Sequence, residues 1–197
     1  MNKFVFLRVV IIILLVAAVL LCLSFIFPKK QFDFSAIIGN ESIKNITLTI
    51  YYTNPKLLTD IPISVEDLII LNDTNKIVVD GEELEKHIKL FYQISNDTVE
   101  SVKKNSSYLD ARLYYVLESK KNGKLFDVAM WGGDGEINSM FVNGIEVKEA
   151  PILYDVIMPF LPQNTAKKWD EFARTQKDKG KGQEDGSVVL IKEDKGT

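Results

Sequence analysis

The sequence has very few of the residues from which most catalytic and metal centres are built. Among its 197 residues there is one histidine, His87, and one cysteine, Cys22. Zinc sites of histidine and cysteine, cysteine–histidine nucleophile pairs and serine–histidine–aspartate triads all need residues that the chain beyond Cys22 lacks. These chemistries are excluded, and we predict no catalytic residue, no cofactor and no metal site. A lone cysteine also excludes an internal disulfide, so the fold must be stabilised by packing.

Charge is missing from one long segment, the apolar run from Val9 to Phe27, which contains Cys22. A helix of about 19 residues spans the ~30 Å hydrocarbon core of a bilayer. Basic residues flank the run on both sides. We therefore predict a membrane anchor of the signal-anchor type at residues 1–28. Its N-terminus is expected on the cytoplasmic side of the cell membrane, and the bulk of the chain on the extracytoplasmic side.

Two alternatives to an uncleaved anchor follow from the same segment. A signal peptide cut after Ser24 would have small residues at Cys22 and Ser24, although the apolar run continues past that point. A lipoprotein would be acylated at Cys22, although the bulky Leu21 precedes it. The sequence leaves the choice among the three open.

The charge of the remaining chain is negative. All 27 acidic residues but only 20 of the 24 basic ones follow Lys30, which gives this part a formal net charge of −7. Such a surface does not favour nucleic acid, and we predict no nucleic-acid partner. Composition divides this part into a juxtamembrane spacer at 29–45, one domain at 46–174, and a polar tail at 175–197 that is mostly disordered.

Strand patterns occur in several parts of the predicted domain. Apolar and polar residues alternate from Ile46 to Thr53, and a brief strand is expected from Lys76 to Val79. Between Tyr108 and Lys148 the pattern predicts a meander of about four antiparallel strands. Two of its turns are marked by Asn122-Gly123 and Asn143-Gly144, the dipeptide typical of tight hairpins.

Helical patterns complete the fold. Gly81 to Ser95 has apolar residues at helical spacing, with acids in the first turn. Two short helices are expected near the C-terminus, one from Pro151 to Pro159 and one beginning at Asn164 or Thr165. For Ile61 to Leu71 a helical turn capped by Ser64 and a strand fit equally well. The predicted fold class is α+β, with a helix packed on an antiparallel meander.

Over Lys44 to Pro162, which contains these strands and helices, the chain resembles uncharacterised single-span cell-envelope proteins of Gram-positive bacteria. The resemblance implies a membrane-anchored envelope protein and transfers no functional residue.

Four residues are candidates for partner binding. Trp131 directly precedes the glycine-rich segment 132–135, and Asp134 lies in it. This segment is either a plain turn between strands or a contact loop. Tyr114 and Tyr115 must point to opposite faces of a strand, so one of the two rings is expected to be exposed.

Three functions fit the sequence. The favoured one is a non-enzymatic module held at the outer membrane face, which binds an envelope protein or a wall component. The second is a small-ligand binding or sensing domain, with a pocket between the helix Leu84 to Ile94 and the meander. The third is a glycan hydrolase that uses two carboxylates.

Overall fold

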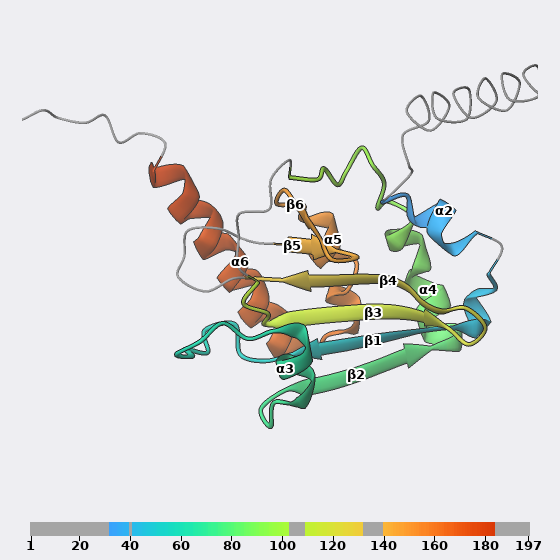
Figure 1. The fold of residues 1–197 in the computed structure, drawn as a ribbon, viewed down its shortest axis with the longest axis horizontal. Coiled ribbons are helices and arrows are strands. Elements are labelled where there is room, and N and C mark those ends of the chain that lie inside the picture. The colour runs from blue at the N-terminus through green and yellow to red at the C-terminus, as the bar shows by residue number, and fades with distance from the viewer. Residues whose placement is uncertain (1–31, 40, 103–108, 132–139, 184–197) are drawn as a thin grey trace, which may run out of the picture. The chain divides into compact units, whose positions relative to one another are not determined.

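The computed structural model describes residues 32–39, 41–102, 109–131 and 140–183 (Figure 1). Their centre is a six-stranded antiparallel sheet with the strand order β2-β1-β3-β4-β5-β6. The strands are β1 (Ile46–Tyr52), β2 (Asn75–Asp80), β3 (Leu113–Ser119), β4 (Gly123–Met130), β5 (Met140–Val142) and β6 (Ile145–Val147). The predicted α+β class and the four-strand meander are confirmed, and β1 and β2 extend that meander at one edge.

The hairpin turns differ in detail from each other. Between β5 and β6, Asn143 and Gly144 both have positive φ, 51° and 76°, as a tight Asn-Gly turn requires. Between β3 and β4 only Gly123 has a positive φ, 69°, and the strand register shifts between Leu117 and Glu118. Both predicted hairpins are therefore present, and only the second has the Asn-Gly geometry at both positions.

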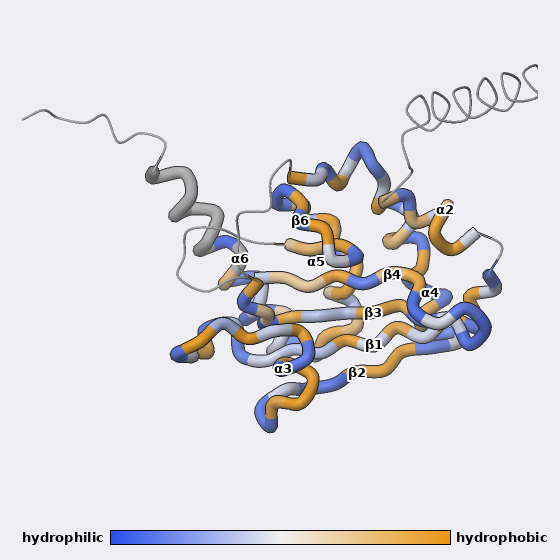
Figure 2. Tube along the Cα trace, in the orientation of Figure 1, coloured by the Kyte–Doolittle hydropathy of each residue, from blue (hydrophilic) through white to orange (hydrophobic). Residues whose placement is uncertain are grey.

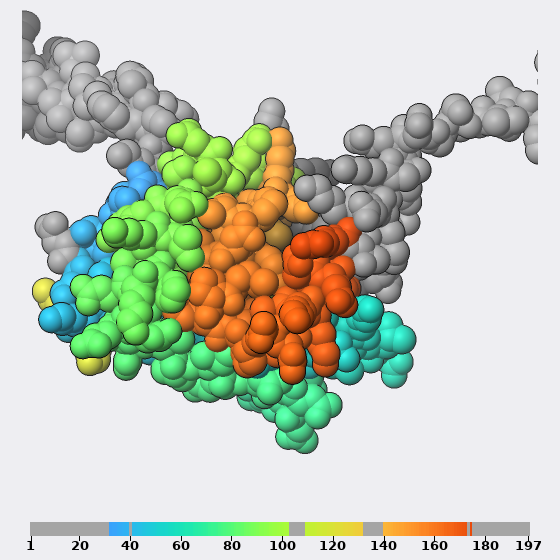
Figure 3. All heavy atoms as spheres, turned by 180° about the vertical axis from the view of Figure 1, so that it is seen from behind, coloured from blue at the N-terminus to red at the C-terminus, as the bar shows by residue number. Residues whose placement is uncertain are grey.

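The main core lies on one face of the sheet, which we call the inner face. Leu48, Tyr115 and Phe126 of neighbouring strands are fully buried there. The face is covered by α2 (Phe34–Ile38), α4 (Gly81–Phe91), α5 (Ile152–Asp155) and the start of α6 (Gln163–Gln183). Figure 3 shows this side, with α4 in green, residues 140–160 in orange and α6 in red-orange.

The folded unit begins before Ile46. Phe32, Phe34 and Ile38 are buried in the main core, and the Phe34 ring lies 5.3 Å from that of Phe91. These residues fall in the segment predicted as a juxtamembrane spacer, so that prediction is wrong from Phe32 onward. The polar residues between the aromatic ones are typical of a spacer, but the segment contains a one-turn helix, α2, whose apolar side packs on the domain.

The outer face of the sheet is covered by α3 (Val65–Ile70) and by the loop before it. Ser64 caps α3: its Oγ accepts a hydrogen bond from the Asp67 backbone N–H at 3.0 Å. This settles Ile61 to Leu71 as a helical turn. Leu68 of α3 is fully buried against Tyr114, Val116 and Ala129.

The C-terminal helices are present, with changed bounds. α5 ends at Asp155, and a 3₁₀ turn, η2 (Met158–Phe160), follows it. α6 continues to Gln183, so the prediction of disorder is wrong for residues 176–183. A helix that begins on a packed domain is already nucleated, and a polar sequence can extend it without burying an apolar side.

Within the described ranges, none of the helices has the length and apolar character needed to cross a membrane. The predicted span, Val9 to Phe27, lies outside the described residues, as does the whole segment after Gln183.

Candidate functional site

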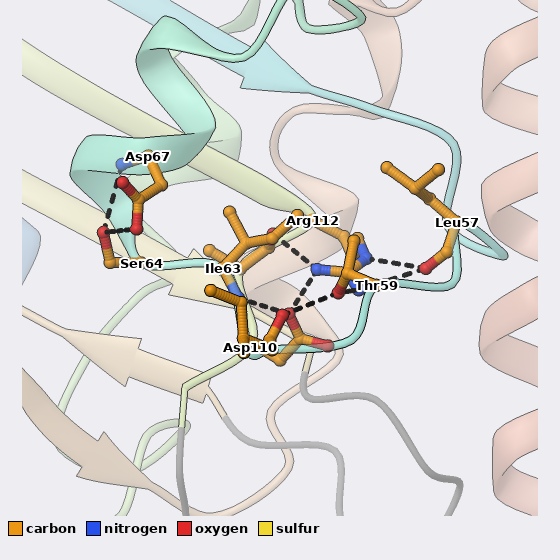
Figure 4. Close-up of polar contacts among 9 residues, drawn as sticks. Leu57, Thr59, Ile63, Ser64, Asp67, Asp110 and Arg112 are labelled. Carbon is orange, nitrogen blue, oxygen red and sulfur yellow. Dashed lines mark hydrogen bonds and ion pairs between the residues drawn. The ribbon is translucent and has the colours of Figure 1, made fainter.

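A buried ion pair at the start of β3 organises the outer side of the domain (Figure 4). Asp110 and Arg112 stand two residues apart and therefore on the same side of the chain, where Arg112 Nη1 contacts Asp110 Oδ1. Both residues are buried. Removing charges from water costs free energy, so a buried pair serves mainly to fix one geometry.

That geometry is the path of the loop from Leu57 to Ile63. Arg112 donates to the Leu57 carbonyl oxygen, from Nη2 at 3.0 Å and from Nε at 3.3 Å, and Nη2 also donates to Thr59 Oγ1 at 3.1 Å. Asp110 Oδ1 accepts a hydrogen bond from the Ile63 N–H at 2.7 Å. The two ends of the loop are therefore held by one ion pair, which Figure 4 shows between them.

The anchored loop and α3 expose large aliphatic side chains. Leu58 is 93% exposed and Ile61 72%, whereas Ile63, directly after them, is buried. On α3, Ile70 is 77% exposed and Ile69 40%, while Leu68 is buried. We call Leu58, Ile61, Ile69 and Ile70 the loop–helix surface.

Exposed aliphatic side chains are ordinary when scattered singly, but these four lie on one loop and the helix that directly follows it. In Figure 2 hydrophobic stretches mark both elements. The loop that carries Leu58 and Ile61 is tied by four hydrogen bonds to Asp110 and Arg112. Apolar groups held on an ordered backbone lose little conformational entropy on binding, so this surface is suited to contact an apolar protein surface.

Trp131, the first predicted contact residue, is not on the surface. It is 2% exposed, and its ring is stacked on that of Trp169 with centroids 4.7 Å apart. Tyr154 contacts it edge-on at 5.3 Å. The burial of Trp131 argues against a contact role for this residue, because the start of α6 covers the end of β4.

Tyr114 and Tyr115 do point to opposite faces, but both are buried. Tyr115 donates its hydroxyl to the Leu153 carbonyl oxygen at 2.9 Å, and burial raises its pKa well above the ordinary value. Tyr114 donates to Asp127 Oδ2 at 3.2 Å, and burial together with the Asp127 charge raises its pKa too. The expectation of one exposed ring is wrong, because α3 covers the outer face. Asp134 lies outside the described residues.

At the interface predicted to hold a ligand pocket, the apolar side of α4 packs into the core. Leu84, Ile88 and Phe91 of α4 are buried in the main core. A pocket of about 160 Å³ lies instead where the end of β1 meets the start of α6. It is lined by Tyr52, Thr53, Asn54, Pro55, Asn75, Thr165, Lys168 and Trp169. Pockets for drug-sized ligands measure roughly 300–1,000 Å³, so this one fits only a very small molecule.

Among the residues that the structure describes, no three histidine, cysteine or acidic side chains are grouped so that they can hold a metal ion. The hydrolase hypothesis stays a prediction.

Comparison of the chain with family models, with curated proteins and with solved structures gave no match. The resemblance to envelope proteins therefore stays a prediction, and the case for a function rests on the chain's own residues.

The loop–helix surface was missed by the sequence reasoning. Ile69 and Ile70 belong to an apolar block, and such a block is expected in a core rather than on a surface. One signal in the sequence pointed to the anchored loop. An acid and a base, Asp110 and Arg112, stand two residues apart at the start of an apolar strand. This spacing indicates a buried ion pair with polar partners elsewhere in the chain.

Proposed function

We propose that the chain is a membrane-anchored, non-enzymatic module whose extracytoplasmic domain binds a protein of the cell envelope through the loop–helix surface. The observation that carries the proposal is the exposure of Leu58, Ile61 and Ile70 on a backbone that a buried ion pair holds in place. The apolar run from Val9 to Phe27 supports the anchoring, since it is long enough to cross a bilayer once.

The chemistry of this surface favours a protein partner over a wall glycan. Glycans are bound through hydroxyl groups, which need polar partners, whereas the four side chains of the surface are aliphatic. A protein partner would offer an apolar depression of matching size, because affinity in protein interfaces is concentrated in a few well-packed side chains. The small-ligand alternative has weaker support, because the pocket beside α6 is small and the apolar side chains of α4 are buried in the main core.

Site-specific photocrosslinking tests this proposal. The full chain is produced in a bacterial host with benzoylphenylalanine in place of Leu58, Ile61 or Ile70, and cells are irradiated before lysis. Tyr92 provides the matched control position, since its ring is 45% exposed and lies just after α4, away from the loop.

We expect one discrete crosslinked protein at the three surface positions and none at Tyr92. The proposal fails if the three positions give no adduct, or if Tyr92 gives the same adducts at the same yield.

A further inference from the structure

The two edges of the sheet are not equivalent. Next to β6, the backbone of residues 100–102 closes the edge: Val102 N–H donates to the Glu146 carbonyl oxygen at 2.9 Å and Lys148 N–H to that of Glu100 at 2.8 Å. At the other edge, β1 is the only described strand with which β2 pairs. In Figure 1 no other described strand lies beyond β2. An open edge strand is a template for another strand.

The backbone groups that face this open edge can be identified. Thr53 N–H donates to the Arg112 carbonyl oxygen, and Lys120 N–H donates to that of Asn45. Odd-numbered residues of β1 therefore direct their backbone groups toward β3, and even-numbered ones toward β2. The partners of those even-numbered residues are Val79, Ile77 and Asn75. It follows that Lys76 and Val78 present their N–H and C=O groups to the open edge. Asp80 presents its N–H there, whereas its C=O belongs to the first turn of α4, of which Asp80 is the N-cap.

We propose that two copies of this chain pair through β2 in an antiparallel, two-fold symmetric arrangement centred on Val78. In that register Val78 lies opposite the partner's Val78, and Lys76 lies opposite the partner's Asp80. Val78 forms a hydrogen-bonded pair with the partner's Val78, and each Asp80 N–H donates to the partner's Lys76 carbonyl oxygen, which would give roughly four backbone hydrogen bonds across the interface. The sheet continues without interruption from one copy into the other, and this dimer is independent of the function proposed above.

Charge complementarity selects this occupant and this register. The residues of β2 at the open edge are, in order, basic, apolar and acidic: Lys76, Val78 and Asp80. The strand is therefore complementary in charge to a second copy of itself that runs in the opposite direction. A shift by two residues would place Lys76 opposite the partner's Val78 and lose both charge pairs. A shift of the register by one residue would place residues of one face of β2 opposite residues of the other face of the partner's β2.

The edge also lacks most of the features that keep edge strands apart. β2 has six residues, contains no proline, and pairs with β1 in an unbroken register. Val78, at its centre, is 57% exposed. A lysine on an edge strand usually disfavours pairing with another strand. In this register the charge of Lys76 is neutralised by the partner's Asp80 opposite it.

A charge-swap experiment on the full chain in detergent tests the dimer, with mass measured by light scattering after size exclusion. Lys76→Glu places like charges opposite each other twice in a homodimer, and so does Asp80→Lys. A mixture of the two variants restores both opposite-charge pairs in the heterodimer. Far-UV circular dichroism of each variant checks that it is folded.

We expect the parent chain to be a dimer. Each single variant should dissociate at a concentration at least about tenfold higher than the parent, since two cross-strand pairs change sign. The equimolar mixture should dimerise like the parent. A monomeric parent chain at about 100 µM, single variants that dimerise as the parent does, or a mixture that stays monomeric would each overturn the proposal.

Crosslinking in membranes gives an independent readout. In a Cys22→Ser background, Val78→Cys should form a disulfide-linked dimer on mild oxidation, because directly opposite residues lie about 5.5 Å apart at Cα. Tyr92→Cys in the same background is the exposed control and should stay monomeric. Equal dimer yields from the two variants would argue against pairing through β2.

Discussion

The ring of Trp131 lies 4.7 Å from the ring of Trp169, with the two planes 26° apart. This contact joins the residue directly after β4 to a residue of α6 that lies 38 positions later in the sequence. It fixes the start of α6 on the domain and removes from the surface the tryptophan that the sequence had suggested as a contact residue.

The first prediction concerns this stacked pair. Trp169→Ala should lower the free energy of unfolding by about 3–5 kcal/mol, because it leaves a large cavity beside Trp131. Trp169→Phe should cost clearly less, since it keeps an aromatic ring and the indole Nε1 has no hydrogen-bond partner among the described residues. Denaturant unfolding followed by circular dichroism measures both. Equal losses for the two variants would contradict the packing described here.

The second prediction concerns the ion pair beneath the loop. Arg112→Met should destabilise the chain by about 3–5 kcal/mol, because it leaves Asp110 buried without its cation. Adding Asp110→Asn should recover part of that loss, since the neutral amide oxygen can still accept the Ile63 N–H. A double-mutant cycle measures the coupling, and strictly additive effects would show that the two side chains act separately.

The third prediction concerns alkaline pH. Burial raises the pKa of Tyr115 above the ordinary value of 10.0. Its neutral form therefore contributes stability that is fully present below pH 10 and is lost as the pH rises from there toward the folded pKa. Tyr115→Phe should cost about 1 kcal/mol at pH 7, for the lost hydrogen bond to Leu153, and should lose less stability than the parent between pH 9 and pH 11. Unfolding free energies at about those pH values test this, with Tyr92→Phe as the exposed control.

The fourth prediction separates binding from stability. Leu58→Glu and Ile70→Glu should change the free energy of unfolding by no more than about 0.5 kcal/mol, because both side chains are already in water. The same variants should abolish copurification of the crosslinked partner. Leu68→Glu is the contrasting variant, since Leu68 is buried and its charge should unfold the outer side of the domain. Full retention of the partner by both surface variants would count against the loop–helix surface.

Local patterns were enough to predict the elements that alternate or repeat regularly. The residues of β3 and β4 alternate between the two faces of the sheet, which made the strands predictable. The helix α4 was predictable because one of its sides carries Leu84, Ile88 and Phe91. Ile61 to Leu71 fitted two structures, because a short apolar block fits a strand as well as a helix; the Ser64 cap makes it a helix.

The errors share one physical cause, which is packing between distant segments. Phe34 was assigned to a spacer because nothing nearby in sequence buries it, and in the structure Phe91 and Phe126 do so. Trp131 was a candidate contact residue, and one ring of the Tyr114–Tyr115 pair was expected to be exposed, because a single sequence does not show that α6 and α3 pack over these positions. Exposure of Leu58 and Ile70 depends in the same way on tertiary placement.

Cysteine labelling of intact cells decides whether the loop–helix surface is exported and occupied by a partner. Leu58→Cys and Tyr92→Cys are placed separately in the full chain with Cys22→Ser, and the cells are treated with a membrane-impermeant maleimide. We predict rapid labelling at position 92 in intact cells, and labelling at position 58 only after detergent removes the partner. Equal labelling of both positions in intact cells, or labelling of neither before lysis, would contradict the account.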